Sequence, residues 1–180
     1  MIYVFLANGF EETEAITTID ILRRAELTVT TVGIGGRHIT GSHQITIQAD
    51  ITDSEITLSD FDAVVLPGGM PGTLNLEQSE IVHAFIDMAA QRNKLIGAIC
   101  AAPSILGHKG LLEGKKAVCF PGFEDELSGA IITDQSVEED GNFITAKGAG
   151  VTIDFALKLT ERLAGKNIAE KIRMSIQCIR

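Results

Sequence analysis

The stretch K-L-I-G-A-I-C-A-A-P-S-I-L, from Lys94 to Leu106, decides the fold. Its first half is a short apolar run with β-branched residues, which is typical of a strand buried on both faces. Pro103 then suits the first turn of a helix, where its missing N–H costs nothing. The pattern therefore predicts that Cys100 lies where a buried strand gives way to a helix.

This position gives Cys100 a possible chemical role. A tight turn between a strand and a helix is the geometry of a nucleophile elbow, in which one side chain stands beside free backbone N–H groups. A helix N-terminus favours the thiolate, so we expect a depressed pKa for Cys100 and not for Cys119 or Cys178. The alternative is that Cys100 is a small buried hydrophobic residue, as most free cysteines are.

Composition limits the class of protein. The chain has 180 residues, of which 45% are hydrophobic and 22% charged, and it is long enough to form a single domain over residues 1–180 with a proper core. Its net charge of −9 argues against binding nucleic acid through a basic patch or binding an anionic membrane.

The termini and cysteines suggest a location. The N-terminal residues M-I-Y-V-F-L-A-N-G-F lack a basic start, and their apolar run is too short for a signal peptide or a membrane span. The three cysteines are too few for a disulfide framework, and without a C-x-x-C pair a zinc site is not indicated. We therefore expect free thiols in a reducing cytoplasm.

Apolar runs predict the strands. A pair of short exposed strands is expected within His38–Ala49, and a hairpin around Asp140–Gly141 joins Ser136–Glu139 to Asn142–Ala146. Buried strands are predicted at Ile2–Leu6, Ala63–Leu66 and Lys94–Ile99, and further strands at Leu27–Ile34 and Lys115–Phe120.

Helical spacing fills the gaps between these strands. The first helix carries an apolar stripe made of Ala15, Ile16, Ile19, Leu22 and Ala25. Helices are predicted at Glu11–Ala25, Asn75–Gln91, from the elbow to about His108, at Phe123–Leu127, Val151–Leu163 and Ile168–Ile179.

Strands that alternate with helices predict an open α/β sheet, mostly parallel, with helices on both faces. Ligands bind beyond the carboxyl ends of the strands in such folds. The loops at Ala7–Glu14, Pro67–Gly72 and Gly148–Gly150 are expected at that edge together with Cys100. This shared edge is the main reason to expect a functional Cys100.

Three carboxylates, Glu11, Glu12 and Glu14, follow the first strand. Acidic residues favour a helix N-terminus by complementing its dipole, which is the simpler explanation. One of them, protonated and beside Cys100, could instead donate a hydrogen bond to the sulfur or shuttle protons. The pattern does not select which of the three faces the cysteine.

Backbone groups near the elbow could stabilise an oxyanion. Pro67-Gly68-Gly69 could present one N–H group and Ala101 the other, although a glycine turn without a ligand is the alternative. No histidine follows His108, and His108 itself would lie about 12 Å along an unbroken helix from Cys100. A Cys-His-Glu triad of the glutamine-amidotransferase kind is therefore excluded. Gly33-Ile34-Gly35-Gly36 opens no helix, so it is not a dinucleotide fingerprint.

Four segments recur in the order seen in a known family. They are G-F-E-E-T-E-A at Gly9–Ala15, V-V-L-P-G-G at Val64–Gly69, A-I-C-A-A-P at Ala98–Pro103 and G-A-G-V-T-I-D-F-A at Gly148–Ala156. Through them the chain resembles the ThiJ/PfpI superfamily over nearly its whole length, and within it the parkinsonism-associated deglycase family and its bacterial relatives.

The resemblance implies a flavodoxin-like three-layer sandwich, similar to class I glutamine amidotransferases, in a homodimer without a cofactor. It implies that Cys100 is the nucleophile, that Glu14 contacts it, and that Gly69 and Ala101 supply oxyanion N–H groups. Attributed activities include glyoxalase chemistry, deglycation of proteins and nucleotides, chaperone action and oxidative-stress sensing. Some members have a histidine after the cysteine or at the position of Phe120; both positions are apolar here, which argues against a protease.

Two functional hypotheses follow. In the first, the Cys100–Glu14 pair acts on small reactive aldehydes or glycated substrates. In the second, Cys100 is a redox sensor that is oxidised to a sulfinate stabilised by Glu14, with a signalling or chaperone output. The sequence does not separate them, and it identifies neither the physiological substrate nor the protein partners.

Overall fold

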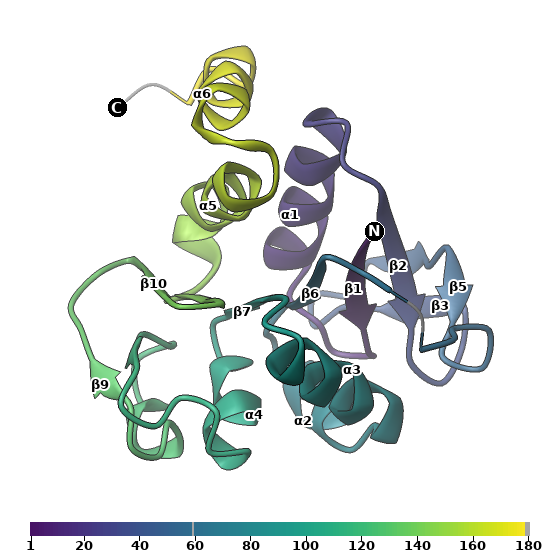
Figure 1. Cartoon of the computed structure of the whole chain (residues 1–180). Helices are drawn as coiled ribbons and strands as arrows, with labels where there is room; N and C mark the ends of the chain where they lie inside the picture. The colour runs from purple at the N-terminus through teal and green to yellow at the C-terminus, as the bar shows by residue number, and fades with distance from the viewer. Residues whose placement is uncertain (59, 179–180) are drawn as a thin grey trace.

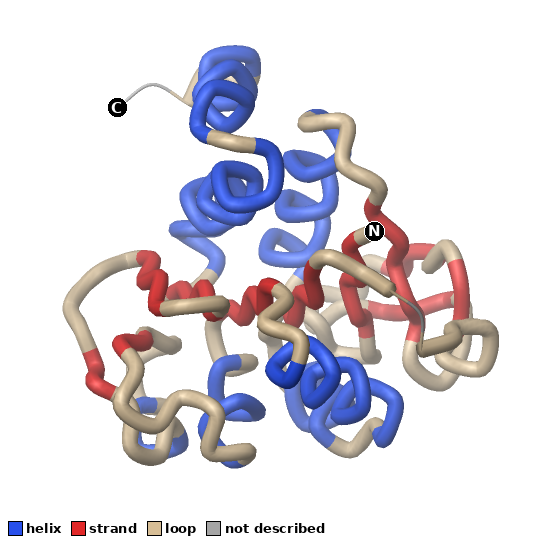
Figure 2. The backbone as a smooth tube through the Cα atoms, in the orientation of Figure 1, coloured by secondary structure: helices blue, strands red, loops and turns tan. Residues whose placement is uncertain are grey.

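The computed structural model describes residues 1–58 and 60–178. A sheet crosses the middle of the molecule, with helices on both sides of it (Figures 1 and 2). The helices of one side are α1 (Glu12–Arg24), α5 (Thr152–Ala164) and, packed on α5, α6 (Lys166–Ser175); those of the other side are α2 (Gly72–Glu77), α3 (Glu80–Gln91) and α4 (Pro103–His108).

The main sheet has seven strands, and every neighbouring pair is parallel except β10 with β11. This confirms the predicted three-layer α/β architecture. In spatial order the strands are β10 (Val137–Asp140), β11 (Phe143–Ala146), β7 (Leu95–Ile99), β6 (Ala63–Leu66), β1 (Ile2–Leu6), β2 (Val29–Gly33) and β5 (Ile51–Thr52).

The core is divided between the two faces of this sheet because side chains alternate along a strand. In β1, Tyr3 and Phe5 join a cluster that includes Phe85 of α3, with the Phe5 and Phe85 rings 5.4 Å apart in an edge arrangement. Val4 and its alternate neighbours join a second cluster with Phe155 of α5. The continuous apolar runs read from the sequence therefore reflect burial on both faces.

The predicted helix Asn75–Gln91 is wrong in one respect, because it consists of two helices. α2 ends at Glu77 and α3 begins at Glu80. Ser79 has an extended backbone, and its hydroxyl accepts a hydrogen bond from the Val82 N–H as an N-cap. This cap starts a new helix, although the spacing of the apolar residues continues across it and so predicts one continuous helix.

The predicted strand Lys115–Phe120 is also wrong in extent. Only β8 (Lys116–Ala117) forms, and it pairs with β9 (Ile131–Ile132) in a small separate sheet. The backbone N–H groups that follow bond elsewhere, Val118 to the Thr145 hydroxyl and Phe120 to the Cys100 carbonyl. These bonds bring the segment to the elbow instead of extending the main sheet.

The short strands β5 and β9 are not among the predicted elements; the others lie where the sequence predicts them, with small differences. Ile16 is 40% exposed and so does not belong to the apolar stripe of α1. Ile39 of the expected exposed pair is buried. The predicted end of the last helix, Ile179, lies outside the described residues. The remaining elements are the antiparallel pair β3 (His38–Thr40) and β4 (Thr46–Gln48) and the 3₁₀ turns η1 (Glu124–Glu126) and η2 (Ala149–Val151).

Within residues 1–58 and 60–178, none of the helices combines the length and the apolar character needed to cross a bilayer.

Candidate active site

Cys100 sits in a strained turn at the carboxyl end of β7. Its φ of 66° lies in the left-handed region, which non-glycine residues seldom adopt. Two backbone hydrogen bonds hold this conformation: the Cys100 N–H donates to the Ala146 carbonyl at 2.9 Å, and its carbonyl accepts from the Phe120 N–H at 2.8 Å. The short helix α4 begins at Pro103. The predicted turn between a buried strand and a helix, with the backbone geometry of an elbow, is therefore present.

Three of the residues selected from the sequence meet at the half-buried Cys100. The Glu14 carboxyl is hydrogen-bonded to the sulfur, and the N–H groups of Gly69 and Ala101 are donors to it. They come from α1, from the loop after β6 and from the elbow itself. A Cβ atom on Gly68 would lie 2.6 Å from Cys100 Cβ and 2.8 Å from Glu14 Oε2, so this close approach depends on a glycine.

The three acidic residues at the start of α1 have three different partners. Glu11 is the N-cap, and its carboxylate accepts from the Glu14 N–H at 2.6 Å. Glu12 turns to the β3–β4 loop and accepts from His43 N–H at 2.7 Å. Glu14 turns the other way and accepts from the Gly68 N–H at 2.9 Å. Only Glu14 is therefore directed at Cys100.

Burial controls the charge of this pair. Burial raises the pKa of Glu14 to about 7, although hydrogen bonds from Cys100 and the Gly68 N–H favour the carboxylate. Burial likewise raises the pKa of Cys100 to about 12, and the adjacent Glu14 charge adds to this rise. Because the two groups share a hydrogen bond, they titrate as a unit that still holds one proton above the first pKa.

The expected depressed pKa of Cys100 is thus wrong in direction. The expectation counted the backbone donors, and the N–H groups of Gly69 and Ala101 do favour the thiolate. It omitted the desolvation of the sulfur and the neighbouring carboxylate, which together outweigh those donors. Cys119 is buried as well, and burial raises its pKa to about 11.

Phe120 and Gly148 complete the surroundings of the pair. Phe120 is 47% exposed, and a Cβ atom on Gly148 would lie 3.2 Å from its ring and 3.8 Å from Glu14 Oε1. The sequence predicts the Gly148–Gly150 loop at the same edge of the sheet as Cys100, and this is confirmed for Gly148, which lies close to Glu14. Apart from the expected edge, the sequence carried no signal that places an aromatic ring against this glycine.

The histidines lie elsewhere. His108 bridges two carboxylates, with Nδ1 2.5 Å from Glu77 Oε1 and Nε2 2.8 Å from Glu126 Oε2. His83 lies beside the Glu77 carbonyl, 2.6 Å away. These contacts join α2, α3, α4 and η1, and they direct both rings to partners other than Cys100.

One set of residues in the described part of the chain could gather around a metal ion. Ligand atoms of Glu11, Glu12 and His43 lie within 4.8 Å of one another. Glu12 is already bonded to the His43 N–H and ring, and Glu11 caps α1. Hydrogen bonds within the set explain its geometry without an ion.

A parallel α/β sheet with a left-handed cysteine at the end of a central strand, facing a buried carboxyl group, defines an α/β protein with a cysteine elbow. A profile of the DJ-1/PfpI family matches residues 1–162. The chain therefore belongs to the DJ-1/PfpI family, as the sequence resemblance indicated.

Individual relatives agree over most of the chain. The crystal structure of a DJ-1 superfamily protein from Salmonella typhimurium has a TM-score of 0.93 and 41% identity, covering 98% of this chain and 97% of that one. Toxoplasma gondii DJ-1, in a structure described as oxidized, has a TM-score of 0.94 and 34% identity over 98% of this chain and 97% of that one. The glutathione-independent glyoxalase DJR-1.2 of Caenorhabditis elegans is 31% identical over 157 residues, or 86% of this chain and 83% of the relative.

Proposed function

We propose that this protein converts small reactive aldehydes to hydroxy acids without a cofactor, with Cys100 as nucleophile and Glu14 as the proton-transfer group. The observation that carries the proposal is the meeting of a buried carboxyl group and two backbone N–H groups at one half-buried sulfur. A nucleophile, a general acid–base group and oxyanion donors are what addition to a carbonyl requires.

The first step is addition to an α-oxoaldehyde such as methylglyoxal. Cys100 Sγ bonds to the aldehyde carbon while the thiol proton passes to the Glu14 carboxylate, and the N–H groups of Gly69 and Ala101 stabilise the oxygen as charge develops on it. The raised pKa of Glu14, about 7, suits a group that must both accept and return protons near neutral pH. Glu14 then gives this proton to the oxygen, so the product is a neutral hemithioacetal and Glu14 is again a carboxylate.

The second step moves one proton between neighbouring carbons. Glu14 removes the proton from the carbon bonded to sulfur and passes it to the neighbouring carbonyl oxygen, which gives an enediol. It then moves the proton of the hydroxyl on the sulfur-bearing carbon to the adjacent carbon, so that the enediol becomes the thioester of a 2-hydroxy acid. Water then cleaves the carbon–sulfur bond, which releases the hydroxy acid and restores the thiol. No external oxidant or reductant is needed, because one carbon is oxidised as its neighbour is reduced.

The glyoxalase name of the Caenorhabditis elegans relative supports this reaction class. Removal of the same aldehydes from modified proteins or nucleotides, a deglycase activity, is an extension of the proposal. There the hemithioacetal or hemiaminal first releases its thiol or amine, and Cys100 adds to the aldehyde that is set free. We place neither protease nor amidotransferase activity here, because the two positions that carry a histidine in some members are Ala101 and Phe120, and no histidine follows His108.

Methylglyoxal consumption and lactate formation by the purified protein test the proposal. Cys100→Ser should abolish both, whereas the matched variant Cys178→Ser should retain them because Cys178 lies at the far end of the chain beside Arg173. Lactate formation by Cys100→Ser at the wild-type rate would show that another group is the nucleophile.

A second candidate function is redox sensing by the same residue. A sulfinate on Cys100 would accept hydrogen bonds from protonated Glu14 and from the two N–H donors. The relative from Toxoplasma gondii is described in an oxidized form. If graded peroxide oxidises Cys100 alone while aldehyde turnover is undetectable, this second function replaces the first.

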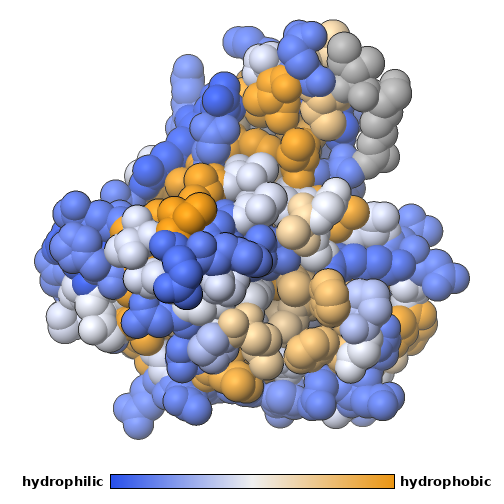
Figure 3. All heavy atoms as spheres, turned by 180° about the vertical axis from the view of Figure 1, so that it is seen from behind, coloured by the Kyte–Doolittle hydropathy of each residue, from blue (hydrophilic) through white to orange (hydrophobic). Residues whose placement is uncertain are grey.

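We also propose a cytoplasmic homodimer that needs neither a metal nor a disulfide. Ile16 on α1 and Ile153 on α5 are 40% and 38% exposed, and these two helices lie against each other. Figure 3 shows further hydrophobic side chains gathered towards the end of the molecule formed by α5 and α6. Sedimentation with reductant and chelator present should give a dimer, and a monomer at micromolar concentration counts against this.

A further inference from the structure

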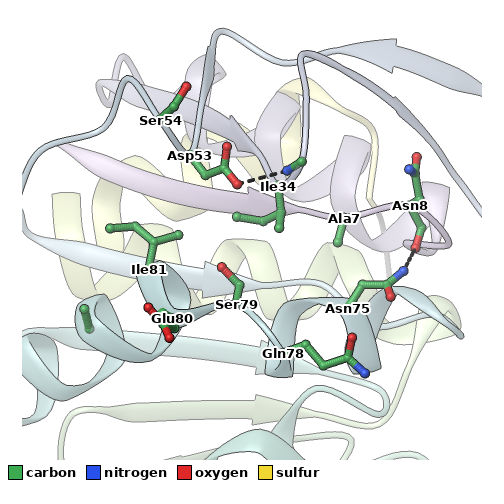
Figure 4. A pocket seen from close by; sticks show the side chains of 12 residues that line it. Ala7, Asn8, Ile34, Asp53, Ser54, Asn75, Gln78, Ser79, Glu80 and Ile81 are labelled. Carbon is green, nitrogen blue, oxygen red and sulfur yellow. Dashed lines mark hydrogen bonds between the residues drawn. The ribbon is translucent and has the colours of Figure 1, made fainter.

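A separate cleft lies on the same edge of the sheet, away from the Cys100 pair. Its volume is about 950 Å³, and it opens between the ends of β1, β2 and β5 and the junction of α2 with α3. Figure 4 shows its two walls, with Asp53 and Ile34 on the strand side and Ser79 and Glu80 on the helix side. Neither Cys100 nor Glu14 lines it.

The cleft exists because the helices on this face stop short of the sheet's edge. α2 packs on β1, and α3 packs on β6 and β7. Ile34 and Ile81 are consequently only partly buried, although both pack against the core. In Figure 4 these two side chains lie between Asp53 on one wall and Glu80 on the other. They form an apolar surface between two carboxylates.

The charge of the lining is of one sign. Asp53 and Glu80 line the cleft, and no lysine, arginine or histidine does so among the described residues. One oxygen of Asp53 accepts from the Gly35 N–H at 3.0 Å, which fixes the carboxylate and leaves its second oxygen for a ligand. Phosphate and other anions would meet two like charges here, so they are disfavoured.

Neutral polar groups occupy the other end of the cleft. The Asn75 amide donates to the Asn8 carbonyl at 2.8 Å, which directs its oxygen as a free acceptor. Asn8 Oδ1 accepts from the Thr40 N–H at 2.9 Å, which leaves its NH₂ group as a donor. This end therefore suits an uncharged group such as a peptide unit or a hydroxyl.

We propose that this cleft binds an aliphatic cation, an amine or guanidinium on a short hydrocarbon stem. The stem lies on Ile34 and Ile81, the charge is paired with Asp53 and Glu80, and the amides take a polar group at the other end. Such a cation is either a free small molecule or an arginine or lysine side chain of a peptide; the chemistry of recognition is the same. The site is independent of the function proposed for Cys100.

Two pairs of matched probes test this. The first is butylguanidine and its neutral counterpart butylurea, and the second is a capped Gly-Arg-Gly peptide and its citrulline analogue. Each is titrated into the full-length protein, and backbone amide shifts of Gly35, Ile81 and Ala84 are followed by NMR. The cationic member should bind about tenfold more tightly than the neutral one. Binding of the peptide but not of butylguanidine identifies the source as a side chain.

Variants separate the cleft from general surface charge. Asp53→Asn keeps an acceptor for the Gly35 N–H, and Glu80→Gln keeps the start of α3, so both variants should fold. Each should lower the affinity for the cationic probe about tenfold. Asp125→Asn removes an exposed carboxylate elsewhere, on η1, and should have no effect. Equal binding of butylurea, equal weakening by Asp125→Asn, or unshifted resonances with every probe would overturn the proposal.

Discussion

Two regions at the first turn of α1 give neighbouring carboxylates opposite properties. Glu12, in the region of the β3–β4 loop, is buried, and Glu14, in the region of the elbow, is buried as well. Burial by itself raises both pKa values, yet that of Glu12 ends at about 2 and that of Glu14 at about 7. Lack of solvent contact alone therefore does not distinguish them, although Glu14 lies deeper in the protein than Glu12.

The difference lies in the donors that each region supplies. Glu12 accepts from the His43 N–H at 2.7 Å and the His43 ring at 2.9 Å, with Ser42 and the Ile45 N–H farther away. Glu14 has the Gly68 N–H and a half-buried thiol whose own pKa is raised. Because several donors bond to Glu12, its carboxylate stays ionised and has a structural role. Glu14 has fewer donors and can therefore exchange a proton near neutral pH.

Replacing Glu14 should have the largest effect. Glu14→Gln keeps a hydrogen-bond donor for the sulfur but cannot exchange protons, so Cys100 should still be alkylated while methylglyoxal turnover falls by about 10²–10⁴-fold. Glu14→Leu should impair both. Glu12→Gln is the matched control. If Glu12→Gln lost turnover while Glu14→Gln kept it, Glu12 and not Glu14 would be the proton-transfer group.

The pH dependence of stability should show the next largest effect. Since burial raises the pKa of Glu14 from 4.5 to about 7, the unfolded chain loses this proton first as pH rises, and stability falls across that interval. The expected loss is about 3 kcal/mol, all of it below the folded-state pKa.

Urea denaturation at several pH values measures how the free energy of unfolding changes with pH, and Glu14→Gln should remove the fall between pH 4.5 and about 7. Glu12 should act with the opposite sign, because hydrogen bonds with His43 lower its pKa; its contribution is lost as pH falls from 4.5 towards about 2. If the free energy of unfolding of Glu14→Gln fell with pH as in the wild type, another group would be responsible for the pH dependence.

Two glycines allow the close contacts in the two regions, and each gives a test. A Cβ atom on Gly41 would lie 2.3 Å from Glu12 Cδ, and one on Gly68 would lie 2.6 Å from Cys100 Cβ. Gly41→Ala and Gly68→Ala should each destabilise the fold by about 1–3 kcal/mol, because the crowding forces a shift. Only Gly68→Ala should also change the alkylation rate of Cys100; an equal change in both would mean that the regions are coupled.

Glu11 should show the smallest effect. Its carboxylate caps α1 and complements the helix dipole, so Glu11→Gln should cost about 0.3–1 kcal/mol in thermal or urea unfolding. Turnover should stay close to that of the wild type. A loss of turnover comparable to that of Glu14→Gln would give Glu11 a role that its capping bond does not suggest.

Local sequence determined much of the fold. The runs at Ile2–Leu6 and Leu95–Ile99 are apolar on both faces, so they predict central strands, and Cys100 followed by Pro103 predicts the elbow. Short elements could not be predicted from local sequence patterns. Strand β5 has only two residues, and the Ser79 cap interrupts a helix whose apolar spacing continues across it. Periodicity needs several residues to be visible, and a single cap does not alter it.

Tertiary structure decided the chemistry of the site. Family resemblance indicated Glu14, whereas the residues alone left three acids as equals. What separates them in space are partners distant in the chain, Gly68 for Glu14 and His43 for Glu12, 54 and 31 residues away. A pKa depends on desolvation and on every donor and charge within a few ångströms. The direction of each pKa shift was therefore decided only when the fold brought these groups together.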